Sequence, residues 1–405
     1  MTTVVVGGGA SGMMASIFAA DKGNNVILIE KNEKLGKKIY ITGKGRCNIT
    51  NLVEPREFLS NVCTNEKFLF SAINSFSSSD TTTFFNENGL KTKVERGNRV
   101  FPESDHASDV TKTLEKKIRQ LGVDVRLNTI VNSINIENGI IKSVSTDKGE
   151  IICDSVVVCT GGVSYPLTGS TGDGYRFARR CGHNVIDPKP SLCGLELNGS
   201  DFVELQGLTL KNVAIKVFAD DKLIYEDFGE MLFTHFGVSG PIILSASCFV
   251  NKHIGKKVNI VIDLKPALSK EVLENRLLNE FSENSNKEIS NVMRSLLPRS
   301  LISLILKNSN IRQLKKCNEI TKEQRVSLIL NIKNLKFNVS SLRKIDEAIV
   351  TSGGVNVKEI NPKTMESKLV KGLYFAGEVI DVDAFTGGFN LQIAFSTGYL
   401  AGKNC

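Results

Sequence analysis

Long hydrophobic runs are absent from this sequence. A helix that spans a bilayer needs about 18 or more consecutive apolar residues, and no stretch of the chain reaches that length. The first residues, Met1 to Gly7, have no basic region before a short apolar run that enters glycines at once. We therefore expect no signal peptide and predict a cytoplasmic protein without a membrane partner.

Paired cysteines and clustered histidines are absent as well. The cysteines form no Cys-x-x-Cys pair and their number, nine, is odd, which argues against a disulfide framework and a zinc knuckle. The histidines match no metal-ligand spacing, and no glycine-rich loop ends in Gly-Lys-Ser/Thr. We predict no metal site and no Walker-type phosphate loop. The histidines stand far apart, at His106, His183, His235 and His253.

The chain begins with a strand–helix–strand pattern. Thr3 to Val6 is a short β-rich run, Ala10 to Asp21 is apolar at helical spacing, and Asn25 to Glu30 is a second buried strand. Ile151 to Cys159 reads as another buried strand of a parallel sheet. A chain of 405 residues is long enough for two or three domains, and its first part is predicted to be α/β.

The middle of the chain has two different patterns. Val213 to Phe218 and Val258 to Ile262 alternate as antiparallel strands do, which favours a barrel. From Ser269 to about Leu335 apolar residues recur at spacing four, and Thr321 to Gln324 has the spacing of a capping box.

The pattern of a buried strand appears again at Leu373 to Gly377. The middle part of the chain is therefore predicted to be inserted into a Rossmann domain. The expected fold class is α/β, with a discontinuous Rossmann-type domain, an inserted β-barrel and a small helical domain. The expected boundaries are 1–188 with 346–405 for the Rossmann domain, 189–268 with 335–345 for the barrel, and 269–334 for the helices.

The basic surplus of the chain is confined to one segment. Residues 269–345 hold 15 Lys/Arg and 7 Asp/Glu, which accounts for the whole net charge of +8. Such a surplus is typical either of a surface for an anionic partner or of a solvated helical face. Because the cations are spread along the segment, we favour the solvated face and do not expect nucleic-acid binding.

One glycine motif has the context of a dinucleotide fingerprint. Gly7-Gly-Gly-Ala-Ser-Gly12 follows a predicted strand and opens a predicted helix, and Glu30 ends the next strand. Gly7 permits the tight turn, Gly9 lets the backbone approach a pyrophosphate, and Gly12 permits close helix–strand packing. The helix start supplies N–H groups for phosphate, and Glu30 is placed to accept from ribose hydroxyls.

Three further segments favour FAD over NAD. The loop Tyr40 to Asn48 is rich in glycine and offers a cation, Lys44 or Arg46, for a diphosphate. Thr160-Gly-Gly162 ends a parallel strand, where dinucleotides lie. Gly377 to Asp383 supplies acids for ribityl hydroxyls, and Thr386 to Gln392 starts a helix whose N–H groups suit the charge of a reduced flavin.

The same segments, with several others, resemble the bacterial flavoproteins of the YhiN/BaiN type, also called aminoacetone-oxidase-like FAD-binding enzymes. The matching motifs span nearly the whole chain in order. They are Val6–Met13, Thr42–Asn48, Thr160–Gly162, Gly169–Tyr175, Gly229–Pro241, Thr351–Val355, Thr364–Lys368, Phe375–Asp381 and Thr386–Asn390.

The resemblance implies an FAD-dependent oxidoreductase. We expect NAD(P)H to reduce the flavin as a transient co-substrate, because only one fingerprint is visible, and flavin N5 to pass hydride to an activated C=C. A 3-oxo unsaturated steroid, a bile-acid-like compound or another small enone fits this chemistry. Two alternatives stay open: a flavin-dependent amine oxidase, and an RNA-acting flavoprotein that uses the basic helical domain.

The predicted cofactor-binding residues follow these motifs. They are Gly7, Gly9, Ala10, Ser11, Gly12, Glu30, Lys31, Lys38, Gly43, Gly45, Arg46, Cys47, Asn48, Thr160, Gly161, Gly162, Gly377, Glu378, Asp381, Gly387, Gly388, Phe389, Asn390 and Leu391. The candidate catalytic groups are Tyr165, after the Thr-Gly-Gly turn, and His235, in the predicted barrel. Either side chain would lie across the substrate from the flavin, where it would stabilise an enolate oxygen or donate a proton.

Overall fold

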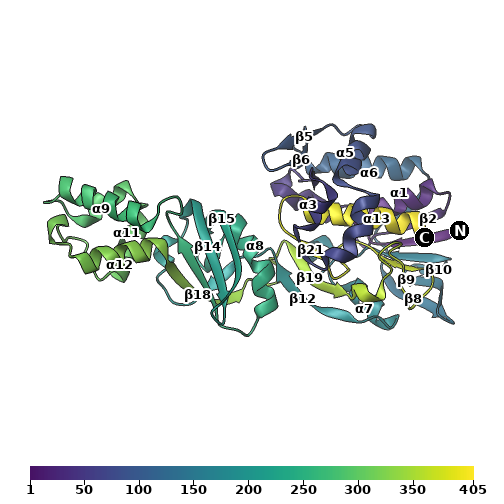
Figure 1. Cartoon of the computed structure of the whole chain (residues 1–405). Helices are drawn as coiled ribbons and strands as arrows, with labels where there is room; N and C mark the ends of the chain where they lie inside the picture. The colour runs from purple at the N-terminus through teal and green to yellow at the C-terminus, as the bar shows by residue number, and fades with distance from the viewer. The chain divides into compact units, whose positions relative to one another are not determined.

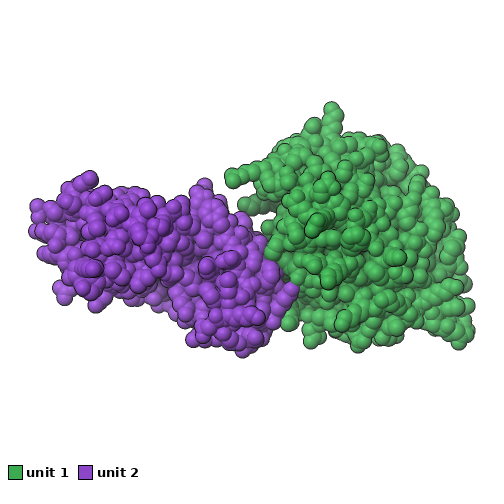
Figure 2. Space-filling model, viewed as in Figure 1, with its two compact units in different colours: residues 1–191, 344–405 green, residues 192–343 purple.

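The computed structural model describes all 405 residues and divides them into two compact units. Unit 1 comprises residues 1–191 and 344–405, and unit 2 comprises residues 192–343, as Figure 2 shows by colour. Unit 2 is thus an insertion in the sequence of unit 1. The predicted fold class, a discontinuous Rossmann-type domain with an inserted barrel and helices, is confirmed.

A five-stranded parallel sheet forms the centre of unit 1, in the order β20-β11-β1-β2-β7. Both faces of such a sheet are covered, which explains the nearly continuous apolar runs in the sequence. Val4, for example, is fully buried and pairs with Val156 on one side and Ile27 on the other. The strands are β1 (Thr2–Val6), β2 (Asn25–Ile29), β7 (Asp124–Arg126), β11 (Ser155–Val158) and β20 (Leu373–Phe375).

Two long helices of unit 1, α1 (Ala10–Asp21) and α13 (Phe389–Asn404), lie side by side (Figure 1). Gly398 and Gly402 make this close approach possible. A Cβ at Gly398 would lie 2.4 Å from the carbonyl oxygen of Ser11, and one at Gly402 would lie 2.4 Å from that of Ala15. The last helix of the chain is therefore packed directly on the first.

The predicted strand from Ile151 to Cys159 is wrong in one respect, because this segment contributes to two sheets. Ile152 ends β10 (Gly149–Ile152), which belongs to a separate antiparallel sheet with β8 (Val131–Glu137) and β9 (Ile140–Thr146). Asp154 causes the break, since its N–H donates to the carbonyl of Thr2 and its carboxylate accepts from the N–H of Thr2 at 2.7 Å. The parallel strand β11 begins only after this turn.

Shorter elements complete unit 1. The strands are β3 (Thr50–Asn51), β4 (Val62–Thr64), β5 (Thr92–Glu95), β6 (Arg99–Pro102), β12 (Val185–Ser191), β19 (Val350–Val355) and β21 (Asp383–Ala384). The helices are α2 (Lys37–Ile41), α3 (Pro55–Leu59), α4 (Phe70–Ser75), α5 (Ser78–Glu87), α6 (Ala107–Gln120) and α7 (Asp173–Arg180). Strands β12 and β19 pair antiparallel, so the segments leaving for unit 2 and returning from it are joined.

A closed antiparallel barrel forms the first part of unit 2, in the order β13-β16-β15-β14-β17-β18. Its longest hairpin, β14 to β15, turns at Asp220 and Asp221, which both have positive φ, as tight hairpin turns require. Helix α8 (Pro241–Val250) follows β16. The strands are β13 (Leu195–Leu197), β14 (Thr209–Ala219), β15 (Lys222–Phe233), β16 (Gly237–Ser239), β17 (Val258–Asp263) and β18 (Leu335–Leu342).

Four helices lie between β17 and β18 in the sequence: α9 (Lys270–Glu283), α10 (Ile289–Val292), α11 (Arg299–Asn308) and α12 (Lys322–Lys333). They share one hydrophobic core with the barrel. The apolar residues predicted at spacing four, Leu273, Leu277 and Phe281, are buried, and Thr321 forms the predicted capping box with Gln324. No helix of either unit is both long and apolar enough to cross a membrane.

Candidate cofactor and active site

The glycine loop after β1 has the geometry that its three glycines predict. Gly7 has φ 105°, and a Cβ there would lie 2.5 Å from the carbonyl oxygen of Cys159. A Cβ at Gly12 would lie 1.8 Å from the carbonyl oxygen of Gly7, so α1 packs tightly against the loop. A Cβ at Gly9 would meet nothing within 4 Å. Gly9 therefore faces open space, where a ligand can approach the backbone.

The N-terminus of α1 is free to bind an anion. Gly9 is the N-cap residue, has no side chain to cap the helix, and no acidic residue lies in the first turn. The first N–H groups of a helix have no partner within it and carry the positive end of its dipole. Ala10 and Ser11 form this first turn, and Ser11 packs against Gly377.

Glu30 is fixed at the edge of this loop. Its Oε2 accepts from the N–H of Gly8 at 2.7 Å, and its Oε1 accepts from the backbone and side-chain N–H groups of Asn32 at 2.8 and 2.7 Å. The carboxylate is thereby held at the carboxyl end of β2, next to the open space at Gly9. The following residue, Lys31, pairs with Asp173 at the start of α7 at 2.7 Å.

Several buried polar side-chain atoms of unit 1 have no hydrogen-bond partner in the chain. They include the Oγ1 of Thr160, the hydroxyl of Tyr175 and the Oδ1 of Asn48. Burial also raises the pKa of Tyr175, so its hydroxyl stays protonated. A buried polar group without a partner costs about 1–3 kcal/mol. These atoms, the open space at Gly9 and the free helix N-terminus fit a large polar dinucleotide such as FAD.

Lys38 and Glu378 form a half-buried ion pair that joins distant segments of unit 1. Lys38 Nζ donates to Glu378 Oε2 at 2.8 Å and to the hydroxyl of Ser164 at 2.6 Å. Ser164 in turn donates to Glu378 Oε1 at 3.0 Å, and the N–H of Thr351 donates to the same oxygen at 2.8 Å. Both predicted residues, Lys38 and Glu378, thus lie together beside the turn that contains Gly161 and Gly162.

Ser164 and Thr351 are missing from the predicted site residues. Thr351 Oγ1 accepts from the N–H groups of Val163 and Ser164 at 2.9 and 3.2 Å, and a Cβ at Gly162 would lie 2.4 Å from it. Thr351 therefore holds the Thr-Gly-Gly turn in place. The only sequence signal was the position of Thr351 at the start of the Thr-Ser-Gly-Gly motif.

The Arg46 guanidinium is paired with carboxylates of unit 1. Its guanidinium donates to Asp105 at 2.6 Å, also pairs with Glu95, and stacks over Phe101 with 4.2 Å to the ring centre. Two carboxylates thus compensate the cation that the sequence suggested for a diphosphate. In the structure Arg46 links its loop to β5 and to the turn after β6.

The backbone of the same loop has an unusual conformation. Gly43 and Gly45 have positive φ, and so do Lys44 and Cys47 at 57° and 59°. Cys47 is fully buried, and burial raises the pKa of its thiol to about 12. A thiol with this pKa is protonated at neutral pH and is a poor nucleophile. Cys47 therefore serves the shape of the loop.

The start of α13 lies against this region. Asn51 Nδ2 donates to the carbonyl of Gly387 at 3.0 Å, and a Cβ at Gly388 would lie 2.4 Å from the backbone of Thr50. The structure thus brings the end of the loop that contains Asn48 and the predicted Gly-Gly helix start together. Gly388 is the N-cap of α13 and offers no side-chain cap.

The other predicted residues at this helix start have structural partners. The side chain of Asn390 bonds to the backbone N–H and carbonyl of Ala384 at 2.9 and 2.7 Å. Phe389 packs edge-on against Phe58, with ring centres 5.1 Å apart, and Leu391 packs against the core. These contacts hold the turn that leads into α13.

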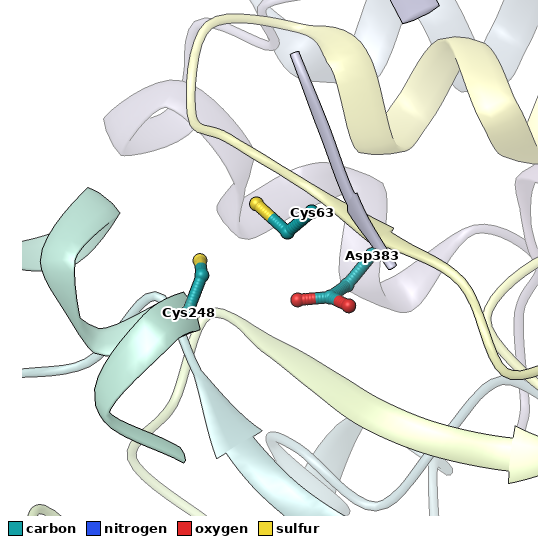
Figure 3. A group of neighbouring side chains, drawn as sticks. All are labelled: Cys63, Cys248 and Asp383. Carbon is teal, nitrogen blue, oxygen red and sulfur yellow. The ribbon is translucent and has the colours of Figure 1, made fainter. Parts of the chain in front are cut away.

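Asp381 and Asp383 are both buried and hydrogen-bonded. Asp381 accepts from Asn65 at 2.9 Å, and Asp383 accepts from the hydroxyls of Ser191 and Ser352 at 2.6 and 3.2 Å. Figure 3 shows Asp383 and Cys63, which lie on the paired strands β21 and β4 of unit 1; Cys248, also drawn, belongs to α8 of unit 2.

The two candidate catalytic residues belong to different units. Tyr165 is half-buried in unit 1, with φ 51°, and its ring lies 6.0 Å from Lys38 Nζ. His235 is exposed in unit 2, between β15 and β16, beside the ring of Phe236. Tyr165 thus lies next to the Lys38–Glu378 pair.

The chain matches the family described as HI0933-like protein Rossmann domain over residues 1–404. It is 31% identical to the 3-dehydro-bile acid delta(4,6)-reductase of Clostridium scindens, over 98% of this chain and 97% of that protein. It is 29% identical to the ribosomal RNA dihydrouridine synthase of Escherichia coli, over 99% of this chain and 97% of that protein.

A solved structure has the same fold. It is the 3-ketosteroid-delta4-(5alpha)-dehydrogenase of Rhodococcus jostii, with a TM-score of 0.54 and 13% identity over 99% of this chain and 96% of that one. The family predicted from the motifs is confirmed. The chain belongs to the HI0933-like family of Rossmann proteins, and it is a flavin-dependent oxidoreductase.

Proposed function

We propose that this protein reduces a carbon–carbon double bond conjugated to a carbonyl. The observation that carries the proposal is the match over the whole chain to a reductase whose name specifies a 3-dehydro-bile acid and its Δ4,6 double bonds. In such a compound the double bonds are conjugated to a ketone. Hydride addition then places negative charge on the carbonyl oxygen, where a hydrogen-bond donor stabilises it.

The residues of unit 1 are assigned to FAD as follows. The N–H groups at the start of α1, next to Gly9, bind the pyrophosphate, and Glu30 accepts from a ribose. Thr160, Tyr175 and Asn48 supply the buried polar atoms that lack partners. The uncapped start of α13 donates to the flavin edge. When bound, FAD supplies the hydride through its N5 atom.

Tyr165 and His235 are the proposed donors to the substrate. Tyr165 follows the Thr-Gly-Gly turn, and its ring centre lies 6.0 Å from Lys38 Nζ. His235 offers a ring nitrogen on an exposed turn of the barrel. Either group would hydrogen-bond the carbonyl oxygen or return the proton that completes the reduction. The electron donor is proposed to be NAD(P)H, bound transiently because the chain has a single fingerprint.

A second substrate is favoured by a separate observation, the 29% match to a ribosomal RNA dihydrouridine synthase. Dihydrouridine is uridine reduced at a double bond that is conjugated to a carbonyl of the base. The reaction class is therefore the same for both relatives, and only the molecule that carries the double bond differs.

The test is anaerobic reoxidation of the reduced protein-bound flavin by separate acceptors. We expect 4-androstene-3,17-dione or uridine-containing ribosomal RNA to restore the oxidised absorption bands, with two hydrogens gained by the product in mass spectrometry. Saturated analogues are the control. Reoxidation by neither acceptor, together with flavin reduction by primary amines, would favour an amine oxidase and overturn the proposal.

The reducing donor needs its own measurement. NADH and NADPH are added separately to the oxidised protein without oxygen. Bleaching of the flavin by either one supports a nicotinamide donor, and no bleaching by both removes it.

A further inference from the structure

The cations of the helical part of unit 2 differ in their partners. Arg276, Lys307, Arg325 and Lys333 form ion pairs with carboxylates. Lys270 and Lys322, at the starts of α9 and α12, are exposed and form no ion pair. Five further cations around α10 and α11 are also exposed and form no ion pair. They are Lys287, Arg294, Arg299, Arg312 and Lys316, which we call the α10–α11 surface.

The fold brings these unpaired cations together although they are spread over 30 positions of sequence. The segments around α10 and after α11 run antiparallel: the N–H of Ile289 donates to the carbonyl of Lys315 at 2.9 Å, and that of Cys317 donates to the carbonyl of Lys287 at 3.0 Å. The backbones of Glu288 and Lys316 form an isolated antiparallel β-bridge. Lys287 and Lys316 are therefore neighbours, and Arg312 precedes Gln313, whose carbonyl accepts from the N–H of Ser290 at 3.3 Å in the same pair of segments.

Arg294 and Arg299 border the same segments. Gln313 Nε2 donates to the hydroxyl of Ser303, one turn after Arg299 on α11, at 3.0 Å. Arg294 lies in the 3-10 turn Met293–Ser295 that follows α10. Glu288 is the one carboxylate in residues 287–299 and 312–317, against six basic residues. Such a local excess attracts a polyanion.

The composition around these cations indicates what kind of polyanion fits. The neighbouring side chains are mostly polar and include Ser290, Asn291 and Gln313. Serine, asparagine and glutamine are residue types that donate hydrogen bonds to phosphate and sugar oxygens in nucleic-acid complexes. Residues 269–334 contain one aromatic residue, Phe281, and it is buried, so no ring is available to stack on a base. A lipid surface would call for more than the one exposed apolar side chain here, Leu314.

The spread of these cations along the sequence argues against nucleic-acid binding, but the fold gathers them, and we propose that the α10–α11 surface binds the phosphate backbone of RNA without reading its sequence. This inference does not depend on the proposed reaction, because the surface lies outside the cofactor site and the binding requires no flavin chemistry. With about five phosphate contacts, we expect a Kd on the order of 1–10 µM at physiological salt. The logarithm of the association constant should fall with the logarithm of the salt concentration with a slope of about −4, which we call the salt slope.

The test is fluorescence anisotropy with a labelled RNA hairpin on the full chain loaded with FAD. The variant Arg299→Gln/Arg312→Gln/Lys316→Gln should weaken binding by about tenfold or more and reduce the salt slope by about 2. The matched control is Lys112→Gln/Lys116→Gln/Arg119→Gln on α6, which removes the same charge from exposed positions of unit 1 and should keep the wild-type affinity. Flavin content and melting temperature confirm that both variants are folded.

Three results would overturn the inference. They are a wild-type Kd weaker than about 100 µM, an equal loss in the control variant, or binding to anionic phosphatidylserine vesicles in place of RNA. Reoxidation by 4-androstene-3,17-dione, measured on the same variants, should be unchanged. A failure of RNA binding and a failure of the proposed reduction therefore give different results.

Discussion

Lys38 Nζ donates to Glu378 Oε2 at 2.8 Å, and the two residues are 340 positions apart in the sequence. The pair joins α2 to the loop after β20, next to the turn that contains Gly161 and Gly162. Both side chains are mostly buried, with exposed fractions of 24% and 19%. Removing one partner leaves the other with an uncompensated charge in a mostly buried site.

Lys38→Met should lower the free energy of unfolding by about 1–3 kcal/mol, because it strands the Glu378 carboxylate. Urea denaturation measures the loss. The double variant Lys38→Met/Glu378→Gln should lose less than the sum of the single variants, since each removes the same pair. Strict additivity of the two losses would show that the pair contributes nothing to stability.

Gly9→Val should abolish FAD binding and leave the fold intact. A Cβ at Gly9 has no protein atom within 4 Å, so a side chain there extends into the space assigned to the pyrophosphate. Flavin absorbance after reconstitution and the circular dichroism spectrum measure the two effects. Gly12→Val is the contrasting variant, because its side chain would collide with the Gly7 carbonyl and should impair folding itself. A Gly9→Val protein that retains FAD at wild-type affinity would place the cofactor elsewhere.

The buried His183 should make the protein less stable in mild acid. His183 Nδ1 lies 3.1 Å from Glu359 Oε2 and its Nε2 lies 2.8 Å from the Ser367 hydroxyl. Burial lowers the pKa of His183 by more than Glu359 raises it. The unfolded chain, with a histidine pKa of about 6.5, therefore binds the proton more tightly, so acid favours unfolding.

The contribution of the neutral, buried His183 to the free energy of unfolding is complete above about pH 6.5 and is lost as the pH falls below that value. The free energy of unfolding should fall by at most about 1.4 kcal/mol for each pH unit, because one proton is involved. Urea denaturation at a series of pH values between neutral and mildly acidic measures it. His183→Gln should flatten the profile in this range, whereas His106→Gln, at an exposed position, should not. An unchanged profile in His183→Gln would assign the pH dependence to other groups.

Tyr165→Phe and His235→Ala should keep FAD and slow the reoxidation of the reduced flavin by an enone about tenfold or more. The phenol or imidazole would otherwise stabilise the developing oxyanion or return the proton. Stopped-flow absorbance measures the rate, and His253→Ala, a second histidine of unit 2, is the control. If both variants react at the wild-type rate, neither residue takes part in the reduction.

Local motifs were predictable because the steric contacts and hydrogen bonds that determine them involve residues close together in the sequence. The loop from Gly7 to Gly12 must turn and let the helix approach, and only glycine permits the contacts found at Gly7 and Gly12. The capping box of Thr321 likewise needs only a partner three residues away. In contrast, Ile151 to Cys159 contains two strands, because Asp154 bonds to Thr2, which is distant in sequence.

The sequence by itself determined the cofactor fold, since the glycine spacing, the buried parallel strands and the family motifs all lie in contiguous segments. Only the tertiary structure decided the partners of the charged side chains. Arg46 faces Glu95 and Asp105, Lys38 faces Glu378, and the five cations of the α10–α11 surface have no carboxylate partner. Charge pairing depends on distances of a few ångströms between segments that are distant in the chain, and those distances exist only once the core has folded.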